Sequence, residues 1–78
     1  MITLSKAISL KLIKLLNERN MTQYKLCKLG GIPRTTINDV FNNRKKRVSV
    51  ETIYQICSTL GITLSEFFED ELFIDISN

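Results

Sequence analysis

Residues that end or interrupt helices are closely spaced in this sequence, and they divide it into short segments. They are Asn20, Gly30-Gly31 with Pro33, Asn42-Asn43 and Gly61. Glycine and asparagine adopt the left-handed backbone in which many helices end, and proline suits the first turn of a helix. Between these breaks, apolar residues recur at the three- and four-residue spacing of amphipathic helices. Because 78 residues leave room for one domain with one core, we predict a small all-α fold.

Five helices are predicted from these breaks and from the capping residues that precede each apolar stretch. The predicted helices are 5–19 with Ser5 as N-cap, 22–30 with Thr22 as N-cap, 33–41 with Pro33 in its first turn, 49–60 with Ser49 as N-cap, and a short helix after Thr63 or Ser65. Together they form one domain, residues 1–70, which is followed by a short C-terminal arm, residues 71–78.

The C-terminal arm is the segment whose structure the pattern leaves most open. Residues 72–76 are partly an apolar run and partly an alternation, which predicts a short strand or an extended segment. Leu10 and Ile13 lie off the main apolar stripe of the first helix. We therefore expect the arm to pack on this helix or to form a dimer contact. A frayed terminus is the alternative.

The charged residues are divided between the two halves of the chain. All eleven lysines and arginines lie at or before Arg47, where the only acids are Glu18 and Asp39, and the other six acids follow. One compact domain with this division should have a basic face and an acidic face, which suits a polyanion on one side. The other interpretation is that these charges only contact solvent and bind no partner.

Within the basic half, residues 22–43 predict a short helix, a turn containing glycine, and a second short helix. In a helix-turn-helix the first helix braces the second, whose N-terminal residues reach base edges. Ile37, Val40 and Phe41 would anchor the second helix from behind. Its outward residues are polar, but paired short helices of this kind also occur in bundles that bind no DNA.

The outward residues of the second helix have side chains that suit base edges. Arg34 can pair with the O6 and N7 atoms of guanine through two hydrogen bonds, and Asp39 can accept from cytosine. Thr35 and Asn38 suit thymine methyl groups or adenine edges. We therefore predict these four residues as base contacts.

Phosphate contacts are predicted on both sides of this helix. Thr22 and Gln23 begin the preceding helix, where free backbone N–H groups favour an anion. The basic run 44–47 follows the second helix. The alternatives are that Gln23 only covers a helix end and that the run is a solvated loop.

The sequence resembles the Cro and phage-repressor family, also called the xenobiotic-response-element family, in its helix-turn-helix signature. The matching positions are Thr22-Gln23, Leu26-Cys27 and Gly31-Ile32-Pro33-Arg34-Thr35-Thr36-Ile37, and the run from Ser49 to Phe68 is similar to the family's fourth and fifth helices. The resemblance covers about residues 8–69. It implies a lambda-repressor-like domain that binds double-stranded DNA sequence-specifically, most often as a homodimer on a two-fold operator, and acts as a transcriptional repressor.

The resemblance also assigns roles to individual positions. Gln23 matches the family's phosphate-binding glutamine. The principal base-reading positions are Arg34, Thr35 and Asp39, with Thr36 and Asn38 close by, and the backbone-binding loop is matched by Asn43, Arg44, Lys45, Lys46 and Arg47. Two positions differ from the common pattern, because Cys27 stands where alanine is usual and Asn43 where glycine is common. Both substitutions are small enough to keep the fold.

Other classes of protein are poorly supported by the composition. The chain has no histidine, no glycine-rich phosphate loop, and two cysteines that are 30 residues apart, so we predict no enzyme, metal site or cofactor. Unpaired cysteines, the lack of a membrane-length apolar run and the lack of a leader at Met1 favour a mature, cytoplasmic protein. The remaining alternative is an interaction module, such as an antitoxin, with a protein partner bound through residues 71–78.

Overall fold

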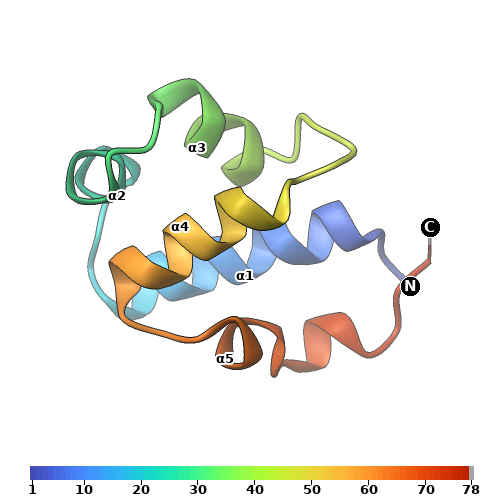
Figure 1. Cartoon of the computed structure of the whole chain (residues 1–78). Coiled ribbons are helices and arrows are strands. Elements are labelled where there is room, and N and C mark those ends of the chain that lie inside the picture. The colour runs from blue at the N-terminus through green and yellow to red at the C-terminus, as the bar shows by residue number, and fades with distance from the viewer. Residues whose placement is uncertain (78) are drawn as a thin grey trace.

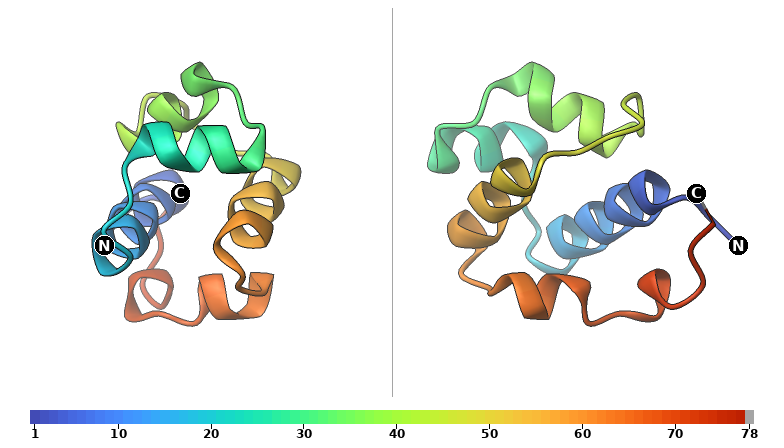
Figure 2. Two further views of the ribbon diagram at one scale, coloured as in Figure 1. Left: turned by 90° about the vertical axis from the view of Figure 1, so that its left-hand side faces the viewer. Right: turned by 45° about the vertical axis from the view of Figure 1, so that its right-hand side comes forward.

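The computed structural model describes residues 1–77, which fold into five α-helices and one short 3₁₀ helix. The elements are α1 (Leu4–Glu18), α2 (Gln23–Gly30), α3 (Arg34–Phe41), α4 (Val50–Leu60), α5 (Leu64–Phe68) and η1 (Glu71–Phe73). The helices α2 and α3 lie on one side of α1 and α4, and α5 and η1 lie on the opposite side (Figures 1 and 2). The predicted five-helix, all-α fold is therefore confirmed.

Most helices begin at the side-chain caps that the sequence predicts. The hydroxyl oxygens of Thr22 and Ser49 accept hydrogen bonds from backbone N–H groups three residues later. At α5 the cap is Thr63 rather than Ser65, and the Glu66 carboxylate accepts a hydrogen bond from the Thr63 N–H in return. Each cap satisfies a backbone donor that has no partner within the helix.

The start of α1 and of α3 differs from the prediction by one or two residues. Thr3, not Ser5, caps α1, because the Thr3 backbone is extended and its hydroxyl accepts from the N–H of Lys6 at 3.2 Å. Pro33 is the N-cap residue of α3 rather than its first helical residue. Four turns use the left-handed backbone that the sequence predicts, at Asn20, Gly31, Asn43 and Gly61.

Every α-helix contributes side chains to one core. Leu12, Leu26, Ile37, Ile56 and Phe67 are fully buried, one from each helix in chain order. Each of these side chains removes apolar surface from water, which is the main favourable term in folding. Both cysteines are free, as predicted, and both are buried, and desolvation raises the pKa of the Cys57 thiol. None of the helices in residues 1–77 has the length and apolar character needed to span a membrane.

The C-terminal arm is not the predicted strand. Asp70 Oδ1 accepts from the N–H of Leu72, and this contact begins the single turn of 3₁₀ helix, η1. η1 packs against α1, and Phe73 contacts the core. Within the described part of the arm, residues 71–77, strand-like pairing is confined to Ile76, which forms one parallel bridge to Ile2. Packing on the first helix was one of the two predicted arrangements of the arm, and the structure has it.

A small ionic cluster holds the start of the arm against α1. Asp70 Oδ2 lies 3.0 Å from Lys11 Nζ and 2.8 Å from Lys14 Nζ. The Asp70 side chain is almost fully covered. The hydrogen bond from Lys14, together with those from the Leu72 N–H and Lys11, holds the pKa of Asp70 well below its usual range. The ionised carboxylate is therefore the form that the fold favours.

The Asp70 cluster predicts a specific pH dependence of stability. Because the folded-state pKa is lowered, the cluster stabilises the fold above the ordinary carboxyl pKa of about 4, and this contribution is lost as the pH falls from there towards the folded-state value. Asp70→Asn should lower the melting temperature at neutral pH, and its difference from wild type should shrink below about pH 4. Melting curves followed by circular dichroism between neutral and acidic pH measure this, with exposed Glu69→Gln as the control. A difference that stays constant across the range would contradict the assignment.

Candidate nucleic-acid interface

The helices α2 and α3 form a braced pair. They pack against each other, and α2 also packs on α4. Their connection turns at Gly31, which has φ +63°, and the buried Ile32 donates its N–H to the carbonyl of Cys27 at 3.2 Å. Gly30 allows α2 to approach α4, since a Cβ there would overlap the hydroxyl of Thr59. The turn between the two helices is thus fixed at both the backbone and the core.

The back of α3 is anchored to the rest of the domain. Ile37 and Val40 are buried, and α3 packs against α1. At the C-terminal end of α3, the hydroxyl of buried Ser9 donates a 2.7 Å hydrogen bond to the carbonyl of Phe41. Because apolar contacts and this hydrogen bond fix the inner side, the polar side of α3 is held in one orientation.

The outer side of α3 carries the residues that the sequence predicts as base contacts. Arg34 and Thr35 are exposed, and Thr36, Asn38 and Asp39 are half-buried. None of the five is enclosed in the core. They therefore remain available on one helix.

Two of these residues have partners on the same surface. Asn42 Nδ2 donates to the side-chain oxygen of Asn38 at 2.6 Å, so the Asn38 amide N–H₂ is the group left for a base edge. Asp39 Oδ2 lies 3.8 Å from Lys45 Nζ. An opposite charge at this distance offsets the repulsion that a carboxylate would otherwise meet near a phosphate.

The predicted phosphate-binding residues lie at both ends of this pair. Thr22 caps α2 with its hydroxyl oxygen, and half-buried Gln23 begins this helix, at the end where free backbone N–H groups favour an anion. After α3, Asn43 turns the chain with φ +54°. The basic residues Arg44, Lys45, Lys46 and Arg47 follow in an exposed loop.

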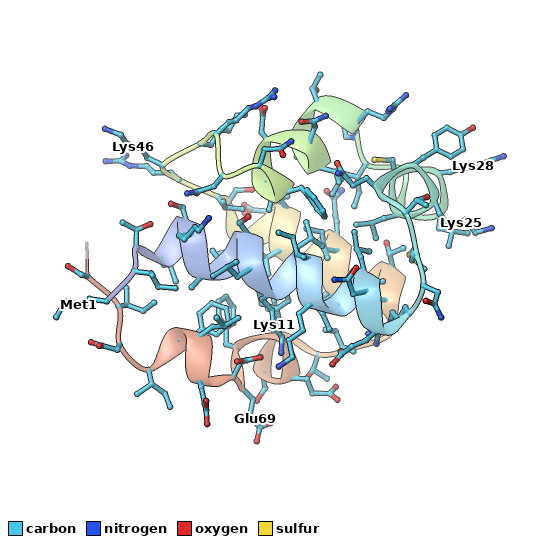
Figure 3. All side chains as sticks on the ribbon, turned by 180° about the vertical axis from the view of Figure 1, so that it is seen from behind. Met1, Lys11, Lys25, Lys28, Lys46 and Glu69 are labelled. Carbon is cyan, nitrogen blue, oxygen red and sulfur yellow. The ribbon has the colours of Figure 1, made fainter. Side chains whose placement is uncertain are left out.

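Basic and acidic groups lie on different sides of the molecule. Lys46 extends from the loop beside α3, and Lys25 and Lys28 extend from α2, whereas Glu69 lies on the opposite side (Figure 3). Lys11 and Lys14 depart from the simple division expected from the sequence, because they contact Asp70 next to the arm. The basic face therefore comprises α2, α3 and the loop that follows α3, and not the whole basic half of the sequence.

Tyr24 is a residue of this surface that the sequence prediction did not include. It lies in the first turn of α2 and remains 57% exposed. The guanidinium carbon of Arg34 lies over its ring, 5.9 Å from the ring centre. An aromatic residue in the first turn of α2, outside the apolar stripe, was the available signal, but the contact depends on how the two helices pack.

Comparisons with known proteins agree with this geometry. A family model described as the Cro/C1-type HTH DNA-binding domain matches residues 11–72, which include α2 to α5. The crystal structure of the prophage Lp1 protein 11 is similar to this chain with a TM-score of 0.83 and 32% identity, over 97% of this chain and 100% of that one. A search of curated proteins found no match. The chain therefore belongs to the Cro/C1-type helix-turn-helix DNA-binding domain family, as its signature predicted.

Proposed function

We propose that this protein is a transcriptional repressor that binds a specific double-stranded DNA operator as a homodimer, with α3 in the major groove. The observation that carries the proposal is the orientation of α3. Its inner side is fixed by Ile37, Val40 and the Ser9–Phe41 hydrogen bond, and its polar side stays open. A rigid helix with an exposed polar side, next to a cluster of cations, is what major-groove recognition requires.

Base recognition is assigned to the outer residues of α3. Arg34 is at the start of the helix, where a side chain reaches furthest into the groove, and its guanidinium suits guanine O6 and N7. Thr35 and Thr36 suit thymine methyl groups, and Asn38 an adenine edge. Asp39 would accept from cytosine, with Lys45 nearby to limit repulsion from phosphates.

Phosphate contacts are assigned to the two flanks of α3. Thr22 and Gln23 offer hydrogen-bond donors at the start of α2, and on the other side Asn43 offers its side-chain amide and the basic loop, residues 44–47, offers charge. Contacts of this kind fix the register of a protein on the duplex but carry no sequence information themselves. Their contribution to affinity should be the same on every sequence.

A homodimer is part of the proposal because one domain offers a single short reading helix. A single short helix contacts few base pairs, and helix-turn-helix proteins commonly bind two half-sites about 34–36 Å apart, one helical turn. Repression is the simplest result, because an occupied operator excludes other proteins from the same DNA.

A protein partner for residues 71–78 is the second candidate. The exposed Ile74 favours it. Against it, Phe73 contacts the core, and Asp70, just before the arm, is engaged with α1. DNA binding through α3 accounts for more of the exposed residues than a protein partner for the arm does.

Comparison of Arg34→Ala with Lys46→Ala tests the proposal. Arg34→Ala should remove base preference at one position of each half-site and reduce affinity for the preferred duplex by about 1–3 kcal/mol. Lys46→Ala should weaken binding to all sequences alike, because it removes only a phosphate contact. The measurement is the affinity for a set of duplexes selected from a random pool and varied one base pair at a time.

Lys14→Ala is the matched control for charge. It removes the same charge as Lys46→Ala, but next to Asp70 and away from α3, so DNA affinity should change least in this variant. If Arg34→Ala keeps the base preference of the wild-type protein, the assignment of α3 as the reading helix is wrong.

A further inference from the structure

We infer that Tyr24 is a positioning residue that orients Arg34 and thereby sharpens the selection of guanine at the base pair that Arg34 reads. The inference rests on the proposed function, since it concerns the same surface. It extends that function to a residue of α2 that has no role in the core.

The geometry places the two side chains on separately anchored helices. Tyr24 belongs to the first turn of α2, and Arg34 is the first residue of α3. The connection between the helices is fixed by buried Ile32 and its 3.2 Å hydrogen bond to Cys27. The backbone that carries Tyr24 is therefore held in place relative to that of Arg34, and the guanidinium carbon lies 5.9 Å from the centre of the ring.

The contact with Tyr24 is the constraint on the Arg34 side chain. Within residues 1–77, the guanidinium of Arg34 forms no ion pair and no hydrogen bond, and the nearby acid of α3, Asp39, is paired with Lys45 instead. Without the ring, this long exposed side chain would sample many rotamers. Tyr24 itself is 57% exposed, so its presence is not explained by burial.

Restriction of Arg34 matters because guanine recognition is directional. The two hydrogen bonds to O6 and N7 require the planar guanidinium fork in one orientation. Arginine stacks on aromatic faces, and a cation over a ring is attracted by the ring's charge distribution. A guanidinium held over the ring before DNA binds loses less side-chain entropy on binding. The contact also disfavours rotated orientations of the guanidinium that would accommodate another base.

A phosphate contact of the Tyr24 phenol hydroxyl is the alternative to positioning of Arg34 by the ring, and variants can distinguish these two roles. A hydroxyl on this surface can donate to a phosphate oxygen, which would raise affinity for every sequence alike. Tyr24→Phe keeps the ring and removes only that donor. Tyr24→Leu removes the ring and keeps a side chain that α2 tolerates.

The test uses the full chain and the duplex that the wild-type protein selects from a random pool. Discrimination is the ratio of dissociation constants, by fluorescence anisotropy, between the duplex with guanine at the Arg34 position and the same duplex with another base there. Tyr24→Leu should lower this ratio by about two- to fivefold, the strength of an exposed cation–aromatic contact. Tyr24→Phe should keep the wild-type ratio.

Two further variants complete the experiment. Tyr54→Leu removes a ring that is also exposed, at 59%, but lies on α4, and should keep the wild-type ratio. In an Arg34→Ala background, Tyr24→Leu should cause no further loss of discrimination. The inference is overturned if Tyr24→Leu has the wild-type ratio, or if Tyr24→Phe lowers the ratio as much as Tyr24→Leu does. It is also overturned if Tyr24→Leu lowers the ratio further in the Arg34→Ala background. A wild-type protein that selects no duplex would instead overturn the proposed function, and the inference with it.

Discussion

Phe67→Ala is expected to destabilise this domain by about 3–5 kcal/mol, the usual range for loss of a buried phenylalanine. Phe67 is fully buried in α5, with ring centres 5.1 Å from Phe68 and 6.0 Å from Phe73. The substitution leaves a cavity at the point where α5 and the arm meet the core. A domain of 78 residues has a total stability of roughly 4–12 kcal/mol, so a large share of it would be lost.

Phe68→Ala is the matched control, because the neighbouring ring is 38% exposed and should leave a smaller cavity. Urea denaturation measures both variants as the free energy of unfolding. For a domain of this size, about 3 kcal/mol corresponds to a fall in melting temperature of at least about 12 °C. Equal losses in the two variants would mean that α5 does not close the core as described.

The fold was largely predictable because its determinants are local. Caps such as Thr22 and Ser49 act on backbone groups three residues away, and Asn43 and Gly61 end their helices through their own backbone conformation. A sequence displays such short-range effects directly. The apolar spacing then selects the buried side of each helix, and five short helices have few ways to share one core.

The arm was not predictable in detail because its structure depends on distant partners. Residues 72–76 have a pattern that suits a strand, but a strand needs a neighbouring edge, and among residues 1–77 this segment forms one bridge, to Ile2. Asp70 instead meets Lys11 and Lys14 across more than fifty residues of sequence. The predicted Ser5 cap was wrong for a local reason, because Thr3 has the extended backbone and its hydroxyl accepts from the N–H of Lys6.

The candidate interface shows the same division between local and tertiary effects. The polar side of α3 follows from its helical period, so Arg34, Thr35 and Asp39 lie on the accessible side as their spacing predicts. Contacts among the polar side chains could not be read from the sequence. The Asp39–Lys45 pair and the placement of the Arg34 guanidinium over the Tyr24 ring depend on how a loop and two helices meet.

Salt should have the largest effect on DNA binding. Each phosphate that a protein neutralises lowers log K by about 0.9 per decade of salt. The basic loop places four cationic residues, 44–47, beside α3 in each copy of the chain. If two copies make six to ten phosphate contacts between them, affinity should fall by about 10³–10⁵-fold between roughly 50 mM and roughly 200 mM salt.

Lys46→Ala should make this salt dependence shallower, because it removes one phosphate contact per copy. Lys14→Ala, whose lysine contacts Asp70, should leave the salt dependence closest to that of wild type.

The most direct test of the central claim, that the basic face around α3 binds duplex DNA, is therefore the affinity of the wild-type protein for mixed-sequence duplex across this range of salt. We predict measurable binding at low salt and a steep linear decrease of log K with log salt concentration. Absence of binding at low salt, or affinity that does not change with salt, would contradict the account.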